Sequence, residues 1–273
     1  MLSFQAELNV CIHSVEEAAR CIMRYYNNLE PIVNAAANIA LQADRDSQDI
    51  IMGELFKAFP HDGFLGEENT SFYSQLPKGG KRIWIVDPID GTRGFAKKNG
   101  EFCIMVALVE DGVPVLGVVH DPAQSRMTYA TAGGGCFGIN GISKPYPCRV
   151  SNKRNLDICT LTKSHSSTAV SYSNSIINRI SPKEVNETYS AGLKLVKISR
   201  GEADIYLNDY GTFNQWDVCA GHILVKEAGG KMTDQNGNDI IYRGNPSSDQ
   251  GFVASNGFIH SQVLSIIQST RQS

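Results

Sequence analysis

The sequence predicts a protein of mixed α and β structure, with an α+β first half and an α/β second half. Three observations support this prediction. Apolar residues recur at helical spacing near the N-terminus, strand-like apolar runs follow between residues 82 and 119, and strands alternate with helices after residue 150. Because 273 residues are enough for two domains with a substantial core, we expect domains at 1–150 and 151–273.

The first half is expected to begin with two helices followed by strands. Apolar residues at helical spacing predict one long helix over about 4–28 and a second over about 44–59, which ends before Pro60. An Asp111-Gly112 pair predicts a hairpin turn between two strands. The expected strands are 64–68, 82–86, 103–109 and 114–119.

The second half is expected to alternate between the two kinds of element. Gly229-Gly230 predicts the end of one helix. The expected strands are 159–162, 203–207, 231–233 and 251–254, and the expected helices are 193–200, 219–228 and 257–268, with a polar helical segment that begins at 181–185.

Composition excludes several classes of protein. The net charge is −3 and no dense run of Lys and Arg occurs, which argues against binding to nucleic acid polymers or anionic membranes. No apolar run reaches the roughly 18 residues of a membrane span, and the N-terminus lacks a secretory pattern, so we expect a cytoplasmic protein. The seven cysteines form no Cys-x-x-Cys pair and the six histidines do not cluster, which predicts reduced thiols and no zinc site.

The most specific segment is Trp84-Ile85-Val86-Asp87-Pro88-Ile89-Asp90-Gly91-Thr92, where a buried strand is expected to end in two carboxylates. Pro88 and Gly91 favour a sharp turn, so Asp87 and Asp90 are expected to point into one small space. Two close carboxylates repel each other unless a cation lies between them, and hard oxygen ligands suit Mg²⁺. The alternative is a plain Asp-Gly turn.

Other acidic residues occupy similar positions. Glu67 follows a predicted strand, and Asp217 precedes the predicted 219–228 helix. Asp44 opens the second helix; for Asp44 and Asp217 simple helix capping is the alternative interpretation. Glu68 is expected to lie in solvent or behind the ligands.

Taken together, these residues predict a Mg²⁺-dependent hydrolase of phosphate esters that binds two or three ions. The Ile89 carbonyl is a further candidate ligand, and the amides of Gly91 and Thr92 are candidates to hold a phosphate oxygen. Thr92, hydrogen-bonded to a carboxylate, is a candidate to take a proton from water. The predicted metal ligands are Glu67, Asp87, Ile89, Asp90 and Asp217.

Three segments resemble the signatures of the inositol monophosphatase superfamily of Mg²⁺-dependent, lithium-inhibited phosphatases. They are Gly66-Glu67-Glu68, Trp84–Thr92 and Trp216-Asp217…Glu227-Ala228-Gly229-Gly230. The resemblance covers most of the chain in matching order. It implies a layered αβαβα sandwich with the active site between two domains, the metal ligands named above, and Thr92 with Asp44 as the pair that activates water.

Three further segments look like the 3'(2'),5'-bisphosphate nucleotidases, which remove the 3'-phosphate of adenosine 3',5'-bisphosphate (PAP). The segments are Gln42-Ala43-Asp44-Arg45…Gln48, Thr162-Lys163-Ser164-His165-Ser166-Ser167, and Lys194 within Ser190-Ala191-Gly192-Leu193-Lys194. A substrate with a second phosphate needs cationic or donor groups away from the metals; for Lys163 an ordinary surface position is the alternative. The implied substrate contacts are Gly91, Thr92, Thr162, His165, Lys194 and Asp217.

The chain departs from these patterns at two places. Many family members carry a Lys-x-Ser-Pro-x-Thr segment before the position of Asp44, whereas Asn34–Leu41 has neither the lysine nor the proline. Ala191 stands where some nucleotidases have a serine.

The alternatives to a PAP phosphatase are an inositol polyphosphate 1-phosphatase, an inositol monophosphatase and, from a different class, a non-catalytic nucleotide-binding regulator. The sequence leaves open whether the chain is a monomer or a homodimer.

Overall fold

The structure is a computed structural model that describes residues 4–35, 41–165, 171–208, 213–243, 247–248 and 251–271. Ser166, Ser167 and residues 36–40 of the Asn34–Leu41 segment lie outside this description. The helices are α1 (Gln5–Asn28), α2 (Gln42–Ala58), α3 (Thr92–Ala96), α4 (Ser171–Ile180), α5 (Ala191–Ser199), α6 (Cys219–Glu227) and α7 (His260–Arg271), with 3-10 turns at Tyr73–Gln75 and Leu156–Ile158.

The larger sheet has seven strands in sequence order, with β1 and β2 parallel and all later neighbours antiparallel. Asp111 and Gly112 have φ angles of 48° and 85°, which fit the predicted hairpin turn. The strands are β1 (Gly63–Gly66), β2 (Arg82–Asp90), β3 (Cys103–Glu110), β4 (Val113–Asp121), β5 (Arg126–Thr131), β6 (Gly135–Asn140) and β7 (Tyr146–Pro147).

The second sheet has the order β12-β14-β10-β8-β9. Its β8 is parallel to β9 and β10, whereas β14 is antiparallel to β10 and β12. The strands are β8 (Thr160–Lys163), β9 (Glu184–Glu187), β10 (Ile205–Asn208), β12 (Lys231–Asp234) and β14 (Phe252–Ser255), and a separate pair joins β11 (Phe213–Asn214) to β13 (Ser247–Ser248).

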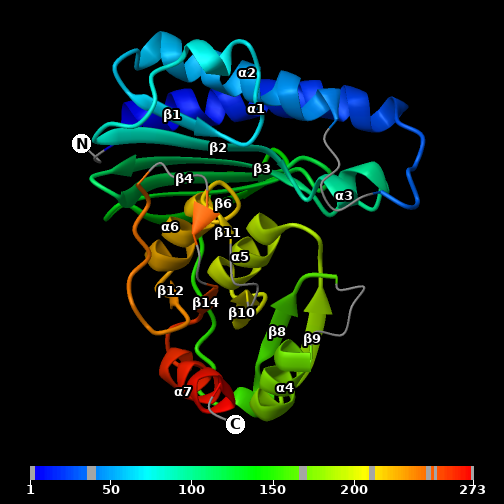
Figure 1. The fold of residues 1–273 in the computed structure, drawn as a ribbon, viewed down its shortest axis with the longest axis vertical. Coiled ribbons are helices and arrows are strands. Elements are labelled where there is room, and N and C mark those ends of the chain that lie inside the picture. The colour runs from blue at the N-terminus through cyan, green and yellow to red at the C-terminus, as the bar shows by residue number, and fades with distance from the viewer. Residues whose placement is uncertain are drawn as a thin grey trace.

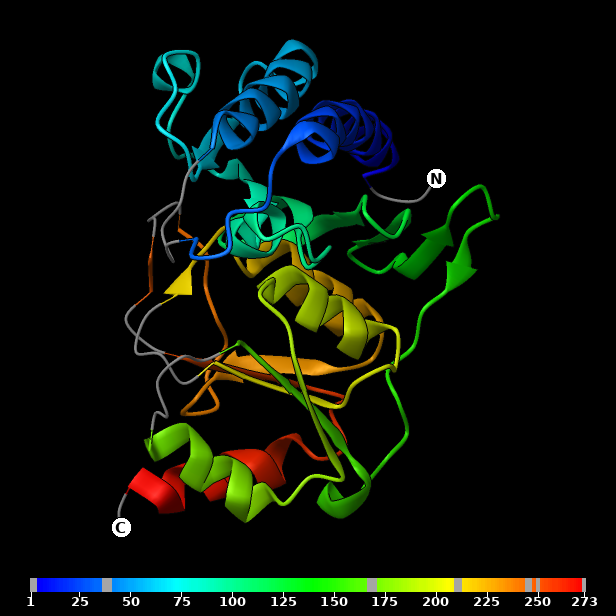
Figure 2. The ribbon, with the colours of Figure 1, turned by 90° about the vertical axis from the view of Figure 1, so that its right-hand side faces the viewer.

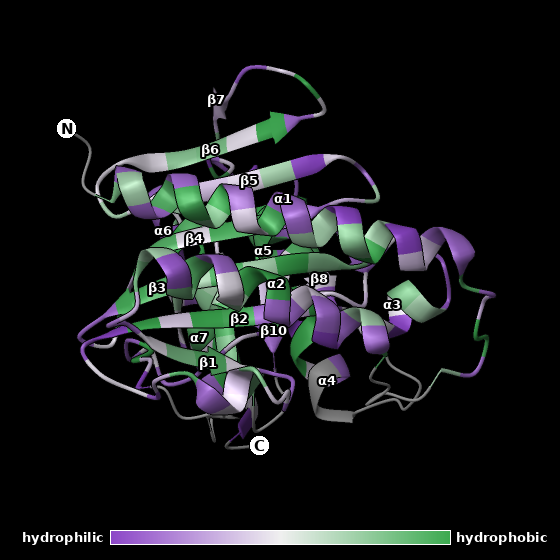
Figure 3. Cartoon of the chain, turned by 90° about the horizontal axis from the view of Figure 1, so that it is seen from above, coloured by the Kyte–Doolittle hydropathy of each residue, from purple (hydrophilic) through white to green (hydrophobic). Residues whose placement is uncertain are grey.

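The elements stack in layers, as Figures 1 and 2 show: α1 and α2, the seven-stranded sheet, α5 and α6, the five-stranded sheet, then α4 and α7. This confirms the αβαβα sandwich. Figure 3 shows α1 and α2 crossing the large sheet on its outer face. Their buried stripes, which include Val15 and Ile51, pack against that face, while Leu195 of α5 and Ile223 of α6 cover the other.

Two local predictions are wrong. The segment at 181–185 is not the start of a polar helix, because Glu184 pairs with Thr160 and begins an exposed edge strand, β9. The pairing with β8 therefore overrides a polar composition that carries no strand pattern. Strand β2 does not end at Val86 but continues to Asp90 across a register irregularity. Helix α4 and strands β5 and β6 have no counterpart among the predictions.

Other expectations agree with the structure or stay untested. All seven cysteines are free and buried. In the part of the chain that the structure describes, no helix is both long enough and apolar enough to span a bilayer. The division into domains at residue 150 stays a prediction; the chain leaves the first sheet at Pro147 and enters the second at Thr160.

Candidate active site

Three carboxylates predicted from separate segments meet in one cluster. Asp87 and Asp90 lie at the end of β2, and Asp217 lies just before α6. One oxygen from each side chain lies within 4.8 Å of the others. Glu67 follows β1, whose Gly66 pairs with Val86, so this parallel register brings Glu67 beside Asp87.

Helix α2 fixes the strand ends that carry these acids. The Gln48 amide donates to the Glu68 carbonyl at 2.6 Å and accepts the Glu68 amide at 2.9 Å, which holds the chain just after Glu67. The Ser47 hydroxyl donates to the Pro88 carbonyl at 3.1 Å. Both side chains are buried, so these contacts replace water for the backbone just after β1 and in the last residues of β2.

Asp90 connects the large sheet to the start of α5. Its Oδ2 accepts the Ser190 hydroxyl at 2.5 Å and the Gly192 amide at 2.6 Å. A Cβ on residue 192 would lie 2.6 Å from the Met105 sulfur and 3.1 Å from Asp90 Oδ2, so glycine is required at this approach. A carboxylate at a helix N-terminus is favourable, which helps to keep Asp90 charged despite its burial.

The cluster has the properties of a site for a hard divalent cation. Burial, and then repulsion from neighbouring carboxylates, raise the pKa of Glu67 to about 8 and that of Asp217 to about 7. The same causes raise the pKa of Asp87 well above its usual value. Buried oxygen ligands that repel one another fit Mg²⁺, which would relieve this repulsion.

Thr92 and Asp44 are in contact beside this cluster. The Thr92 hydroxyl lies 3.2 Å from Asp44 Oδ1 and 3.0 Å from the Ile89 carbonyl oxygen, and it can donate to either. Asp44 also accepts the Leu41 amide at 2.9 Å, so it caps α2 as well. Burial raises the pKa of Asp44 to about 7. The Asp44 carboxylate thus both caps α2 and contacts Thr92.

The turn from β2 into α3 depends on Gly91. Its φ of 90° lies in the left-handed region, and a Cβ there would lie 2.5 Å from the Glu101 carbonyl oxygen. This turn starts α3 at Thr92 and directs the Thr92 hydroxyl toward α2.

These residues line a cleft of about 540 Å³. The predicted site residues in its lining are Glu67, Asp87, Ile89, Asp90, Gly91, Thr92 and Asp217. Asp44, Thr162, His165 and Lys194 are absent from that lining. The lining also includes residues that the sequence interpretation did not name as site residues, among them Arg93, Ser164, Tyr189, Asn208 and Trp216.

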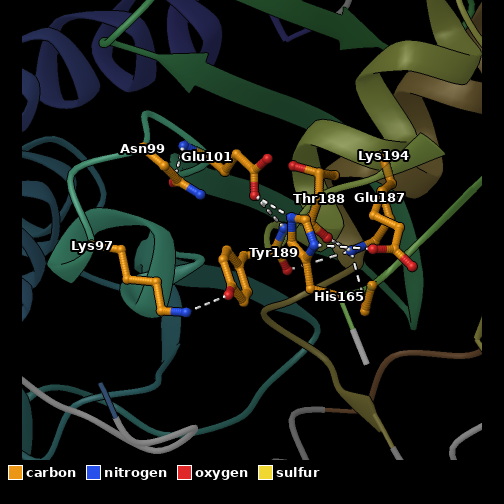
Figure 4. A network of polar contacts seen from close by, with 9 residues as sticks. Lys97, Asn99, Glu101, His165, Glu187, Thr188, Tyr189 and Lys194 are labelled. Atoms are coloured by element: carbon orange, nitrogen blue, oxygen red, sulfur yellow. Dashed lines mark hydrogen bonds and ion pairs between the residues drawn. The ribbon is translucent and has the colours of Figure 1, made fainter. Parts of the chain in front are cut away.

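His165, which is not part of the cleft lining, lies between two glutamates (Figure 4). Its Nε2 is 2.8 Å from Glu101 and its Nδ1 is 3.2 Å from Glu187, while its ring lies 4.4 Å from that of Tyr189. Lys163, whose surface position was the alternative, pairs with Glu187 at 3.1 Å. The His165 ring therefore packs on Tyr189, which itself lines the cleft.

Lys194 is fully buried beneath the loop that contains Thr188 and Tyr189. Its Nζ donates to the Thr188 carbonyl at 3.0 Å, the Ser164 hydroxyl at 3.1 Å and the Tyr189 carbonyl at 3.4 Å. Burial lowers the pKa of Lys194 to about 8. A role in substrate binding for His165, Lys194 and Thr162 remains a prediction.

The missed residues differ in how visible they are in sequence. Arg93 follows Thr92 directly, and Trp216 precedes Asp217, so proximity to a motif could have found both. Tyr189 has no local signal, because it reaches the site only through packing of the 188–190 loop against Lys97 and Glu101 in the segment between α3 and β3.

A model described as the inositol monophosphatase family matches residues 5–272. The chain belongs to this family. It is therefore a metal-dependent phosphatase of the inositol monophosphatase superfamily, a family that generally depends on Mg²⁺, and the acidic cluster is its candidate metal centre.

Curated relatives of this family carry different activities. A fructose-1,6-bisphosphatase/inositol-1-monophosphatase of Thermotoga maritima is 31% identical over 95% of both chains. An inositol monophosphatase of Mesembryanthemum crystallinum is 33% identical over 79% of this chain and 82% of its own length. The 3'(2'),5'-bisphosphate nucleotidase CysQ of Escherichia coli is 29% identical over 82% and 89%. Because the sequence identities to these relatives are similar, they do not show which phosphate ester this chain hydrolyses.

Solved structures agree on the fold. An IMPase from Thermotoga maritima has a TM-score of 0.82 and 29% identity, and covers 98% of this chain and 99% of its own. The extragenic suppressor protein suhB from Bartonella henselae has a TM-score of 0.80 and 28% identity over 97% and 99%.

Proposed function

We propose that this phosphatase removes the 3'-phosphate from PAP to give AMP and phosphate. The observation that carries the hydrolytic part is the 3.2 Å contact between Thr92 and Asp44 beside the carboxylate cluster. A protein that only binds a nucleotide has no need of this pair.

The proposed ligands for Mg²⁺ are four of the cleft-lining acids and one carbonyl: Glu67, Asp87, the Ile89 oxygen, Asp90 and Asp217. When bound, Mg²⁺ supplies positive charge that stabilises the phosphate oxygens and lowers the pKa of water. The family implies inhibition by lithium, which we include in the proposal.

Proton transfer is proposed to run through Thr92 to Asp44. The Thr92 hydroxyl can accept a proton from water while it donates its own to Asp44. Because burial raises the pKa of Asp44 to about 7, this carboxylate takes up and releases a proton near neutral pH. The amides of Gly91 and Thr92 at the start of α3 are proposed to hold a phosphate oxygen.

The choice of PAP is supported by the Thr162–His165 and Lys194 segments and by the similarity to CysQ. A cleft of about 540 Å³ is within the range of small-molecule sites. The second candidate is an inositol phosphate, favoured by the relatives from Thermotoga and Mesembryanthemum.

The test is phosphate release with Mg²⁺ from PAP, inositol 1,4-bisphosphate and inositol 1-phosphate, measured side by side. We expect the highest kcat/KM with PAP, and loss of release after chelation of the metal. A clear preference for inositol 1-phosphate would overturn the nucleotidase assignment, and no release from any ester would overturn the enzyme assignment.

A further inference from the structure

Arg93 is a cation in the cleft lining to which no role has yet been assigned. It follows Thr92 in the first turn of α3, next to the proposed proton-transfer pair. Its Nε is buried and bonds to none of the described residues. A buried donor without a partner is destabilising, so its occurrence in a cleft indicates a ligand that supplies the acceptor.

A rigid support holds the Arg93 guanidinium. Its central carbon lies 5.2 Å from the ring centroid of Tyr189, a distance that allows cation–π attraction. Lys97, four residues further along, donates to the Tyr189 hydroxyl at 2.8 Å, and the ring of His165, two residues after β8, packs on Tyr189, as Figure 4 shows. The Tyr189 amide is also held by Glu101 at 3.1 Å. These contacts fix the ring on which Arg93 rests.

The cation is separate from the acidic cluster. Arg93 forms no ion pair with any described carboxylate, so each of these oxygens is more than 4.0 Å from its guanidinium nitrogens. Trp216 provides a second buried N–H in the cleft lining that has no partner among the described residues. The cleft thus offers carboxylates for metals and, apart from them, unpaired donors for an anion.

We infer that Arg93 binds the second phosphate of a bisphosphate ester and thereby distinguishes bisphosphates from monophosphates. This rests on the proposed function, since it assumes that the ester phosphate lies at the acidic cluster. A guanidinium fork matches two phosphate oxygens and keeps its charge at any working pH. A nucleoside bisphosphate and an inositol bisphosphate share this chemistry. In this view His165 is a positioning residue that acts through Tyr189.

The kinetic test compares Arg93→Met and Arg93→Lys with the wild type. In each, kcat/KM is measured for PAP against adenosine 3'-monophosphate, and for inositol 1,4-bisphosphate against inositol 1-phosphate. We expect Arg93→Met to lower the bisphosphate-to-monophosphate ratio about 10- to 100-fold, mainly through KM. Arg93→Lys should retain part of the wild-type ratio, because lysine keeps the positive charge but lacks the two-pronged guanidinium. Arg149→Met removes an exposed arginine outside the cleft lining and is the matched control.

A binding test separates this inference from the proposed function. Calorimetry on the Mg²⁺-loaded protein is expected to show that Arg93→Met weakens AMP binding about tenfold and inorganic phosphate binding much less. Equal losses for both would overturn the inference, because Arg93 would then contact the ester phosphate. The inference would also be overturned if Arg93→Met left both the bisphosphate-to-monophosphate ratio of kcat/KM and the affinity for AMP unchanged.

The remaining outcomes are also distinct. If wild-type protein releases no phosphate from any ester, the proposed function fails, and AMP calorimetry still decides whether Arg93 binds a phosphate. A ratio that falls only for the inositol pair supports the second-phosphate contact and identifies the inositol bisphosphate as its source.

Discussion

The acidic cluster and the Arg93–Tyr189 pair both line the cleft and are built in different ways. In the acidic cluster, Asp87 and Asp90 come from one strand, with fixed spacing, and only Asp217 comes from the second half of the chain. In the pair, Arg93 lies on α3, whereas Tyr189 lies in the loop between β9 and α5. Two of the three clustered acids therefore depend on the local course of β2, whereas the pair exists only because two halves of the chain pack together.

This difference separates chemistry from selectivity. Buried carboxylates that repel one another are suited to a metal and are therefore expected to act on any phosphate ester bound there. A cation on an aromatic support is expected to act only on esters that carry a second anion. Variants in the acidic cluster should thus change turnover of all esters, and variants at Arg93, Tyr189 or the residues that support them should change stability or preference.

The largest expected effect is that of Asp90→Asn. Replacing this carboxylate should lower kcat for every ester by several orders of magnitude, because it removes a proposed metal ligand. Rates with PAP and inositol 1-phosphate, measured with excess Mg²⁺, check this. Asp111→Asn, at an exposed hairpin turn with positive φ that asparagine tolerates, is the matched control. Loss of activity toward only one ester would break the comparison.

The next largest effect is expected at Thr92. Thr92→Ala should lower kcat by roughly 10²–10⁴-fold, since it removes the hydroxyl that contacts Asp44, while Thr92→Ser should retain much of the rate. Single-turnover rates on two different esters test this. Equal activity of the alanine and serine variants would show that the hydroxyl takes no part in proton transfer.

Beneath the loop that carries Tyr189, Lys194→Met is expected to lower stability. The buried Nζ donates to three oxygens, so its removal leaves acceptors unsatisfied and should reduce the free energy of unfolding by about 1–3 kcal/mol. Thermal unfolding measures this, with exposed Lys144→Met as the control. A stable variant with strongly reduced affinity for AMP would instead identify Lys194 as a direct substrate contact.

The smallest effect concerns pH and metal. The pKa values of Glu67 and Asp217 are raised to about 8 and 7 from ordinary values of 4.5 and 3.8. These groups take up protons on folding, so the metal-free protein should lose stability as pH rises from about 4 to about 8. Mg²⁺ competes with these protons, and excess Mg²⁺ should therefore raise the Tm more at pH 8 than at pH 6, by a few degrees. An equal rise at both values would argue against the carboxylates as ligands.

Much of the fold was predictable because its elements have strong patterns. Helices α1, α2 and α6 bury regular apolar stripes, and β3 and β4 are joined by a turn pair with positive φ. Strand β9 was not predictable, because it is polar and exposed and exists only through its pairing with β8.

The sequence by itself determined the acidic half of the site. Asp87, Pro88, Asp90, Gly91 and Thr92 are adjacent, so backbone geometry alone brings their chemistry together. The family and its hydrolytic chemistry follow from this segment with Glu67 and Asp217.

Only the tertiary structure decided which cations and donors line the cleft beside these acids. His165 and Lys194 have the right residue types, but His165 contacts two glutamates and Lys194 is bonded to the 188–189 loop. The buried Nε of Arg93, by contrast, has no partner among the residues that the structure describes. Residue type reports which charge is available; the direction of a long side chain depends on its packing partners, and these come from distant parts of the chain.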